Sequence, residues 1–198
     1  MADTMDHGQL LFFDTETTGV PRNYKAPASD LQNWPRLVQL AWLLTDAEGR
    51  EIKSAEHIVR PEGFEIPAPA QKVHGISTAA ALSEGVPLRD VLAGFANAMG
   101  SARALLAHNV AFDEKIVGAE FLRCGQADLM GSRPRHCTMQ GSTRYCALPG
   151  PYGFKWPSLQ ELYSKLFGEP LTGAHRALVD VQACARCYFE LRRLGVMK

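Results

Sequence analysis

The sequence predicts a single-domain α/β protein in which a mixed sheet is flanked by helices. Strands are predicted near 9–13, 37–45, 51–59, 103–107 and 135–137, and the first of these is an apolar run that suits a buried strand. Segments with the apolar spacing of helices lie near 68–73, 88–99, 110–123, 139–145, 158–167 and 174–194. The first three strands follow one another, and strand and helix alternate after them. This order predicts a sheet with both antiparallel and parallel pairs.

The connections between these elements carry their own signals. Residues 46–49, Asp-Ala-Glu-Gly, are typical of the turn of a β-hairpin between the second and third strands. The stretch 21–35 holds three prolines and predicts a long loop near the edge of the site. The stretch 146–157 is rich in Gly, Pro and aromatic residues, which predicts an ordered surface loop. Two interpretations of this loop are open. Its Tyr152 and Lys155 contact a ligand, or the loop packs on the protein without any ligand contact.

Length and composition limit the class of protein. The 198 residues, of which 46% are hydrophobic, suffice for one substantial core and leave little room for a second domain. We expect a disordered N-terminal tail at 1–8 and one domain at 9–198. No segment approaches the roughly 20 apolar residues of a membrane span. The polar start lacks the apolar core of a signal peptide, so we expect a cytoplasmic protein without a membrane partner.

Cysteine and charge patterns exclude or weaken other classes. Five cysteines at unpatterned positions predict free thiols rather than a disulfide framework or a zinc site. The 21 Lys and Arg balance 21 Asp and Glu, which by itself does not indicate a nucleic-acid partner. Residues 133–176 carry six bases and two acids, whereas residues 1–60 carry nine acids and six bases. This distribution gives weak support to modest, salt-sensitive binding of a polyanion.

Two carboxylates, Asp14 and Glu16, follow the first apolar run. Side chains two residues apart on a strand share a face, so both can point to one place. Adjacent carboxylates repel each other unless something positive lies between them, and a hard divalent cation is the natural candidate. Taken alone, such a pair more often begins a turn that faces water, so the rest of the chain has to decide.

A third carboxylate, Asp113, follows the apolar run 104–107. Asn109 suits a helix N-cap, which places Asp113 about one turn into the following helix. It then lies near the C-terminal end of a strand, the edge at which open α/β sheets usually bind ligands.

A fourth carboxylate, Asp180, lies in the last predicted helix, which runs to about Leu194. Thr172 or Gly173 can cap this helix, so that His175 falls in its first turn and Asp180 in its second. Five helical residues turn the chain by roughly 500°, so the two side chains lie about 140° apart. They can flank one ligand with distinct tasks. Taken alone, His175 would more often be a helix-start histidine without a catalytic role.

Together these segments resemble the three motifs of the DEDDh 3′–5′ exonucleases. This is the DnaQ-like family, which includes proofreading subunits of polymerases and RNA-trimming enzymes. The matching strings are Phe-Asp-Thr-Glu-Thr-Thr-Gly at 13–19, His-Asn-x-x-Phe-Asp at 108–113 and His-x-x-x-x-Asp at 175–180. The residues at 38–41 resemble the second strand of the family, and those at 73–76 resemble its nucleotide-side loop. The resemblance covers about 9–194 and implies the ribonuclease-H-like arrangement of the sheet.

The resemblance implies five catalytic residues and two bound Mg²⁺ or Mn²⁺ ions. Asp14 would bridge both ions, Glu16 and Asp180 would hold the water-activating one, and Asp113 would bind more loosely, through water. His175 would be the general base. A set of carboxylates without Cys or His favours Mg²⁺ or Mn²⁺ over Zn²⁺. Two such ions about 3.5–4 Å apart can activate water and hold the leaving oxygen.

Several residues near these motifs are candidates for contact with the substrate. Hydroxyl groups and close backbone approach suit a terminal sugar and phosphate, and an aromatic ring suits stacking on a base. The candidates are Thr15, Thr17, Gly19, Val20, His74, Asn109 and Phe112. Phe112 can equally be a core ring under the site. Val20 departs from the larger apolar residues frequent in the family, which bears on the placement of the terminal base. His108 can orient Asn109 or the site, or it can be structural.

The favoured function is a 3′–5′ exonuclease that releases nucleoside 5′-monophosphates from the 3′ end of a single-stranded nucleic acid. Resemblance to proofreading subunits favours DNA, with a role in proofreading or repair, and adds a DNA polymerase as a candidate partner. RNA trimming stays open, because no residue identifies a donor for the 2′-hydroxyl. A phosphodiesterase for small nucleotides and a non-catalytic scaffold of the same fold are the alternatives. The oligomeric state is not indicated by the sequence.

Overall fold

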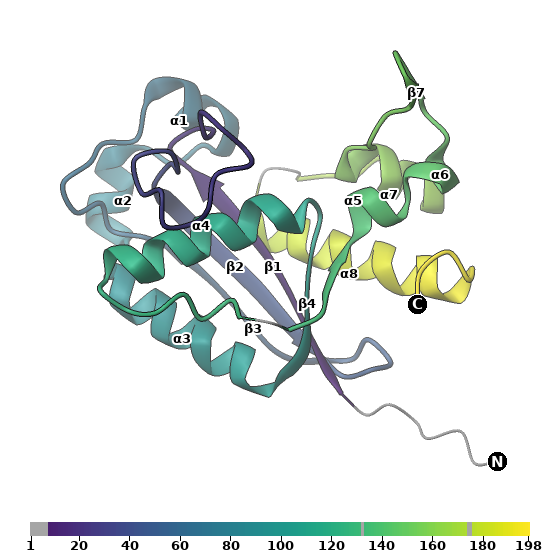
Figure 1. The fold of residues 1–198 in the computed structure, drawn as a ribbon, viewed down its shortest axis with the longest axis horizontal. Helices are drawn as coiled ribbons and strands as arrows, with labels where there is room; N and C mark the ends of the chain where they lie inside the picture. Colours follow the sequence, from purple (N-terminus) through teal and green to yellow (C-terminus); the bar gives the residue numbers. More distant parts are fainter. Residues whose placement is uncertain (1–7, 132, 174–175) are drawn as a thin grey trace.

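The computed structural model describes residues 8–131, 133–173 and 176–198. Its centre is a five-stranded sheet with the strand order β3-β2-β1-β4-β5 (Figure 1). The strands are β1 (Gln9–Thr17), β2 (Leu37–Thr45), β3 (Glu51–Ile58), β4 (Ala102–Ala107) and β5 (Arg135–Cys137). Strands β1, β2 and β3 pair antiparallel, whereas β4 pairs parallel with both β1 and β5. The predicted mixed sheet is therefore confirmed.

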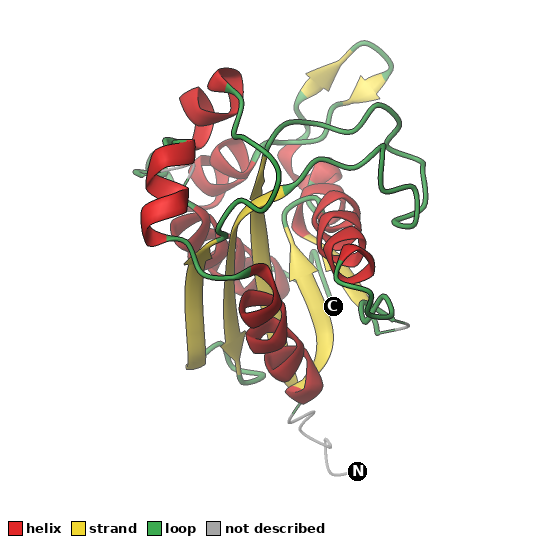
Figure 2. Cartoon of the chain, turned by 90° about the vertical axis from the view of Figure 1, so that its left-hand side faces the viewer, coloured by secondary structure: helices red, strands yellow, loops and turns green. Residues whose placement is uncertain are grey.

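Helices cover both faces of the sheet (Figure 2). In chain order they are α1 (Ala68–His74), α2 (Thr78–Glu84), α3 (Leu88–Ser101), α4 (Val110–Arg123), α5 (Thr138–Gly141), α6 (Thr143–Cys146), α7 (Leu159–Phe167) and α8 (Ala177–Arg193). Every helix among the described residues is too short or too polar to cross a bilayer.

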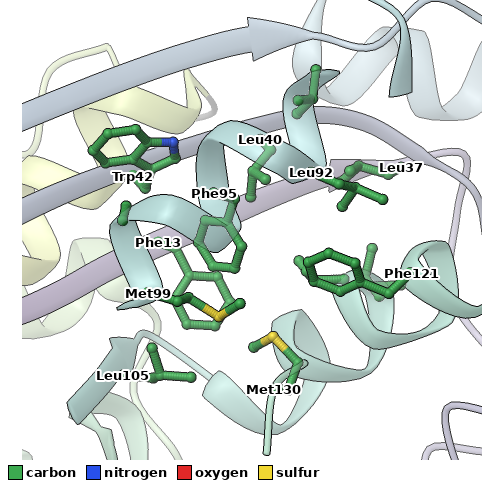
Figure 3. Close-up of a cluster of buried hydrophobic side chains, with 14 of the residues drawn as sticks. Phe13, Leu37, Leu40, Trp42, Leu92, Phe95, Met99, Leu105, Phe121 and Met130 are labelled. Carbon is green, nitrogen blue, oxygen red and sulfur yellow. The ribbon is translucent and has the colours of Figure 1, made fainter. Parts of the chain in front are cut away.

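The larger core lies between the sheet and helices α3 and α4 (Figure 3). Phe13 of β1 and Phe95 of α3 face each other there, with ring centroids 5.3 Å apart. Alternate residues of β2, Leu40 and Trp42 among them, point into the same core. All nine residues of β2 are buried, because helices cover this strand from both sides.

The opposite face of the sheet is covered by α8. Its buried residues recur at helical spacing, as at Val181, Cys184 and Tyr188, and they pack on Leu10 and Phe12 of β1. Strand β1 thus sends its odd-numbered side chains to α3 and α4 and its even-numbered ones to α8. Asp14 and Glu16 continue the even-numbered series, which places them on the α8 face.

Several predicted boundaries are corrected by the structure. Strand β1 continues to Thr17 instead of stopping at residue 13, since β2 pairs with it over this whole length. Helix α8 begins at Ala177, with Arg176 at the N-cap position, so the predicted start at residue 174 is wrong. The predicted helix 139–145 is two short helices, α5 and α6. Helix α2 was not predicted.

The predicted connections have the expected character. Residues 46–49 form the tight turn between β2 and β3, closed by a hydrogen bond from Asp46 N to Arg50 O of 3.0 Å. Residues 18–36 contain neither helix nor strand, as expected. In the stretch 146–157, however, the two short strands β6 (Pro149–Gly150) and β7 (Gly153–Phe154) form a small hairpin that projects from the body (Figure 1).

The predicted free cysteines are confirmed, with three of the five buried. The predicted N-terminal tail falls almost entirely outside the described residues, which begin at Gly8.

Candidate active site

Three carboxylates from β1 and α8 meet at one place. Asp14 and Glu16 lie two residues apart on β1, and Asp180 lies in the first turn of α8. Each offers an oxygen atom, and these three atoms all lie within 4.8 Å of one another. The sequence prediction that these acids converge is met for this set of three.

Asp113 lies beside this group and is held by Thr15. It occupies the first turn of α4 and is 3% exposed. The Thr15 backbone N–H and hydroxyl both donate to Asp113 Oδ1, at 3.1 and 2.7 Å. One carboxylate oxygen therefore has two protein donors. Asp113 does not belong to the group of oxygen atoms within 4.8 Å.

Burial and mutual repulsion shift the acids of the site in one direction. The pKa of Asp14 is raised well above its ordinary value by burial, and then by the negative charges of Asp113, Glu16 and Asp180. Burial, followed by repulsion from Asp180 and Asp113, raises the pKa of Glu16 to about 7. Burial also raises the pKa of Asp113 to about 7, although the hydrogen bonds from Thr15 act against it.

This cluster is suited to divalent cations. Its carboxylates are partly or fully removed from water and repel one another, so bound positive charge would stabilise them. The donors are oxygen atoms only, which suits Mg²⁺ or Mn²⁺. Asp14, Glu16 and Asp180 are the residues that would hold such ions.

The predicted general base, His175, lies outside the described residues. The described chain stops at Gly173 and resumes at Arg176, one residue before α8. Because α8 begins later than predicted, Asp180 belongs to its first turn and not to its second.

His108 has a structural role at the end of β4. Its Nε2–H donates to Pro157 O at 3.0 Å, and its Nδ1 lies 2.9 Å from the Thr138 hydroxyl. Burial lowers the pKa of His108 to about 4, so the ring is neutral near pH 7 and Nδ1 accepts from Thr138. His108 thus ties β4 to the segment before α7, and sequence reasoning had left this role open.

A cavity of about 260 Å³ adjoins the carboxylates. It is lined by the acids Asp14 and Asp180, by His108, and by Ser158 and Gln160 at the start of α7. Ser158 is fixed by a capping box, in which its side chain and that of Glu161 each bond the other's backbone N–H. The cavity wall formed by α7 is therefore well anchored.

The hydroxyl groups predicted to meet the substrate already have protein partners. Thr15 donates to Asp113, and Thr17 donates to Gly19 O at 2.6 Å. Each hydroxyl donates its one proton within the protein and keeps lone pairs that can accept a further hydrogen bond. Val20, just beyond Gly19, is 71% exposed.

The remaining predicted contact residues lie around the same edge. His74 ends α1; its Nδ1 accepts from Ile76 N at 3.1 Å, and burial lowers its pKa. Asn109 occupies the N-cap position of α4, as predicted, in a left-handed conformation with φ 83°, and its side chain makes no capping bond. Phe112 is half-buried, with its ring centroid 6.4 Å from those of Tyr24 and Trp34.

A buried charge cluster, missed by sequence reasoning, fastens the loop 18–36 beside the site. Glu120 of α4 is completely buried, and its Oε1 accepts from Arg36 Nε, Arg123 Nη1 and Leu37 N at 2.8–3.0 Å. Arg123 Nη2 in turn donates to the carbonyl oxygens of Leu31 and Trp34. The sequence holds one signal for this cluster. Glu120 is an acid on the apolar face of the predicted helix 110–123, four residues after Ile116.

The mixed five-stranded sheet with helices on both faces is the ribonuclease-H-like fold, and it carries the acidic cluster Asp14, Glu16 and Asp180. The model of the RNase T exonuclease family matches residues 11–188, so the chain belongs to this exonuclease family. This match confirms the resemblance to the DnaQ-like exonucleases. A search among curated proteins found no match.

Solved structures of Exonuclease I share the fold. Escherichia coli Exonuclease I in complex with a dA16 oligonucleotide has a TM-score of 0.74 at 21% identity, over 94% of this chain and 41% of that one. A product-bound structure of exonuclease I has a TM-score of 0.75 at 21% identity, over 96% of this chain and 45% of that one. Exonuclease I from Methylocaldum szegediense gives 0.73 at 21% identity, over 94% and 40%. The chain thus spans less than half the length of these proteins.

Proposed function

We propose that this protein is a metal-dependent 3′–5′ exonuclease acting on single-stranded nucleic acid, with DNA favoured over RNA. The observation that carries the proposal is the meeting of Asp14, Glu16 and Asp180 within 4.8 Å, in a chain of the exonuclease family. The oligodeoxynucleotide bound to the similar Exonuclease I supports DNA as the substrate. Residues 9–198 would form the exonuclease domain.

The reaction would be hydrolysis of the last phosphodiester bond. The oxygen of water bonds to phosphorus, the bond from phosphorus to the 3′ oxygen of the preceding nucleotide breaks, and a nucleoside 5′-monophosphate leaves. When bound, divalent ions supply activation of the water and stabilisation of charge on the phosphate oxygens. Two Mg²⁺ or Mn²⁺ ions are the expected number.

The residues of the chain would have separate tasks. Asp14, Glu16 and Asp180 would hold the ions, and Asp113, fixed by Thr15, would support them from the side. His175 would take the proton of the attacking water, since an imidazole with its ordinary pKa of about 6.5 is suited to that task near neutral pH. This role of His175 rests on the sequence motif. The proposed substrate contacts are Thr15, Thr17, Gly19, Val20, His74, Asn109 and Phe112.

The test is digestion of 5′-labelled single-stranded DNA, matched RNA and a dinucleotide, each with Mg²⁺, Mn²⁺ or EDTA. We expect the DNA to shorten stepwise from its 3′ end with either ion and to remain intact in EDTA. His175→Ala should abolish most of this activity. Digestion that persists in EDTA, or full activity of His175→Ala, would contradict the mechanism.

The alternatives make different predictions in the same assay. An RNA-trimming enzyme would shorten the RNA faster than the DNA, and a small-nucleotide phosphodiesterase would cleave only the dinucleotide. A scaffold would cleave none of the three. A polymerase partner and a cytoplasmic location remain predictions from the sequence.

A further inference from the structure

Glu56 links the edge of the sheet to the helix that carries Asp180. It lies in β3, the edge strand, and its Oε1 accepts a hydrogen bond of 3.1 Å from Leu178 N, 122 residues further along the chain. Leu178 is the second residue of α8. Glu56 itself does not belong to the group of carboxylates within 4.8 Å.

Among the described residues, the start of α8 receives a side-chain acceptor from another element, Glu56 of β3. Arg176 at the N-cap position makes no side-chain capping bond. The first amide groups of a helix need acceptors from elsewhere, and a carboxylate there also interacts favourably with the helix dipole. Glu56, which lies in β3, gives the start of α8 both a hydrogen-bond acceptor and a negative charge. The first intrahelical bond, from Asp180 N to Arg176 O at 3.0 Å, begins at the residue that belongs to the site.

Glu56 and the carboxylate cluster are connected through the sheet. Asp14 pairs with Ala41 across β1 and β2, and Ala41 pairs with Glu56 across β2 and β3. Residues directly opposite in a sheet point to the same face, so Asp14 and Glu56 stand in one row on the α8 face. The first turn of α8 spans this row, bonded to Glu56 through Leu178 and facing Asp14 through Asp180.

We propose that Glu56 is a positioning residue for Asp180. By accepting from Leu178 N, it fixes the first turn of α8 on the sheet and thereby holds the Asp180 carboxylate within reach of Asp14 and Glu16. The inference rests on the proposed function, because it assigns Glu56 a part in building the same metal site. Glu56 acts through the helix and does not touch the reacting atoms.

The acceptor oxygen is tested by comparing Glu56→Ala with Glu56→Gln in the full chain. The amide oxygen of Gln can still accept from Leu178 N, whereas Ala cannot. We expect Mn²⁺ binding, measured by calorimetry, to weaken about tenfold in Glu56→Ala, the scale typical of residues that orient metal ligands. Glu56→Gln should restore most of the affinity. Hydrogen exchange of the Leu178 amide should be faster in Glu56→Ala only.

A matched control lies on the same strand. Glu51 is exposed in β3 and accepts a hydrogen bond from the Ser54 hydroxyl, so Glu51→Ala should keep the Mn²⁺ affinity of the wild type. If Glu56→Ala does not fold, Glu56→Met takes its place, because Met has similar length and no oxygen acceptor.

The outcomes separate this inference from the proposed function. Unchanged Mn²⁺ affinity in Glu56→Ala, or equal weakening in Glu56→Gln, would overturn the positioning role. Weaker Mn²⁺ binding with unchanged exchange at Leu178 would also overturn it, because the effect would not pass through α8. A wild-type protein that binds Mn²⁺ but leaves every nucleic acid intact would overturn the proposed exonuclease activity and leave the Glu56 result standing. In an active protein, Glu56→Ala should lower kcat about tenfold with KM for the oligonucleotide little changed.

Discussion

At Asp14, burial and three neighbouring carboxylates all act against the charged form of the side chain. Such an arrangement costs stability in the absence of cations, and it persists in a protein when the same groups serve a function. The residues that suit a metal site are therefore also residues that destabilise the metal-free fold. Substitution should separate these two effects.

Asp14→Asn removes a negative charge from this cluster and nearly keeps its shape. We expect exonuclease activity to fall by about 100-fold or more, the scale for losing one electrostatic group of an active site. In EDTA the melting temperature should rise, by about 2–4 °C for each kcal/mol of repulsion relieved. Gel assays and thermal denaturation measure the two effects. Asp30→Asn, at an exposed acid, should change neither.

Thr15→Val tests the hydroxyl that holds Asp113. The variant keeps the backbone N–H bond but loses the 2.7 Å bond from the hydroxyl to Asp113 Oδ1. Since groups that orient metal ligands typically contribute 10–100-fold, we expect activity to fall by about tenfold. Thr15→Ser should keep most of it, because the donor remains. Equal losses in the two variants would count against the hydroxyl as the cause.

At the scale of elements, α4 serves the site at two points. Its first turn presents Asp113, and its Glu120 fastens the loop 18–36 and the start of β2 through Arg36 and Arg123. The helix therefore fixes both an acid of the site and the loop that borders it.

Glu120→Ala would leave two guanidinium groups without their buried partner. Breaking a buried ion pair in this way typically costs about 3–5 kcal/mol, so urea unfolding should occur at a much lower midpoint. Glu190→Ala, which removes the partner of the exposed Arg193, should leave the midpoint nearly unchanged. Similar midpoints for the two variants would show that the buried cluster does not hold the loop.

The elements were predictable where periodic burial decides them. The strand 37–45 and the helix 110–123 begin and end where the sequence indicated, since apolar residues define them. The strand 135–137 also has its predicted bounds, although its residues are only partly buried. The end of β1 was not predictable, because its last residues are polar and are held by pairing with β2. The predicted start of α8 was three residues too early, and in the described part of the chain its first turn is bonded by Glu56 of a distant strand.

Over the whole molecule, the acidic site makes stability depend on pH and on cations. Glu16 and Asp113 have folded-state pKa values of about 7, above their ordinary values of 4.5 and 3.8. Between about pH 4 and pH 7 the folded protein binds more protons than the unfolded one. The free energy of unfolding of the metal-free protein should therefore rise as the pH falls. Charge repulsion is present in full above pH 7 and is relieved toward pH 4.5.

Thermal denaturation in EDTA should therefore give a higher melting temperature at pH 5.5 than at pH 8. Glu16→Gln should reduce this difference, because it removes one of the two groups that titrate in the window. Addition of Mn²⁺ at pH 8 should raise the melting temperature by binding to the folded state alone. A metal-free protein that is more stable at pH 8 than at pH 5.5 would contradict the repulsion.

The four acids of the site were predictable from three short motifs, but their supports were not. Asp14 and Glu16 share a face because they are two residues apart on a strand, which sequence spacing shows directly. The Thr15–Asp113 bond spans 98 residues and the Glu56–Leu178 bond spans 122, so both depend on the assembled sheet. Sequence identifies the groups that do chemistry more readily than the groups that orient them.

The most direct test of the metal site is anomalous X-ray diffraction at the manganese edge from crystals soaked in Mn²⁺ at pH 7.5. We expect an anomalous peak among the carboxylates of Asp14, Glu16 and Asp180, at oxygen distances near the 2.0–2.2 Å typical of small divalent cations. Crystals of Asp14→Asn should show a weaker peak or none. Absence of a peak at these carboxylates in the wild type, with Mn²⁺ bound elsewhere or not at all, would contradict the account.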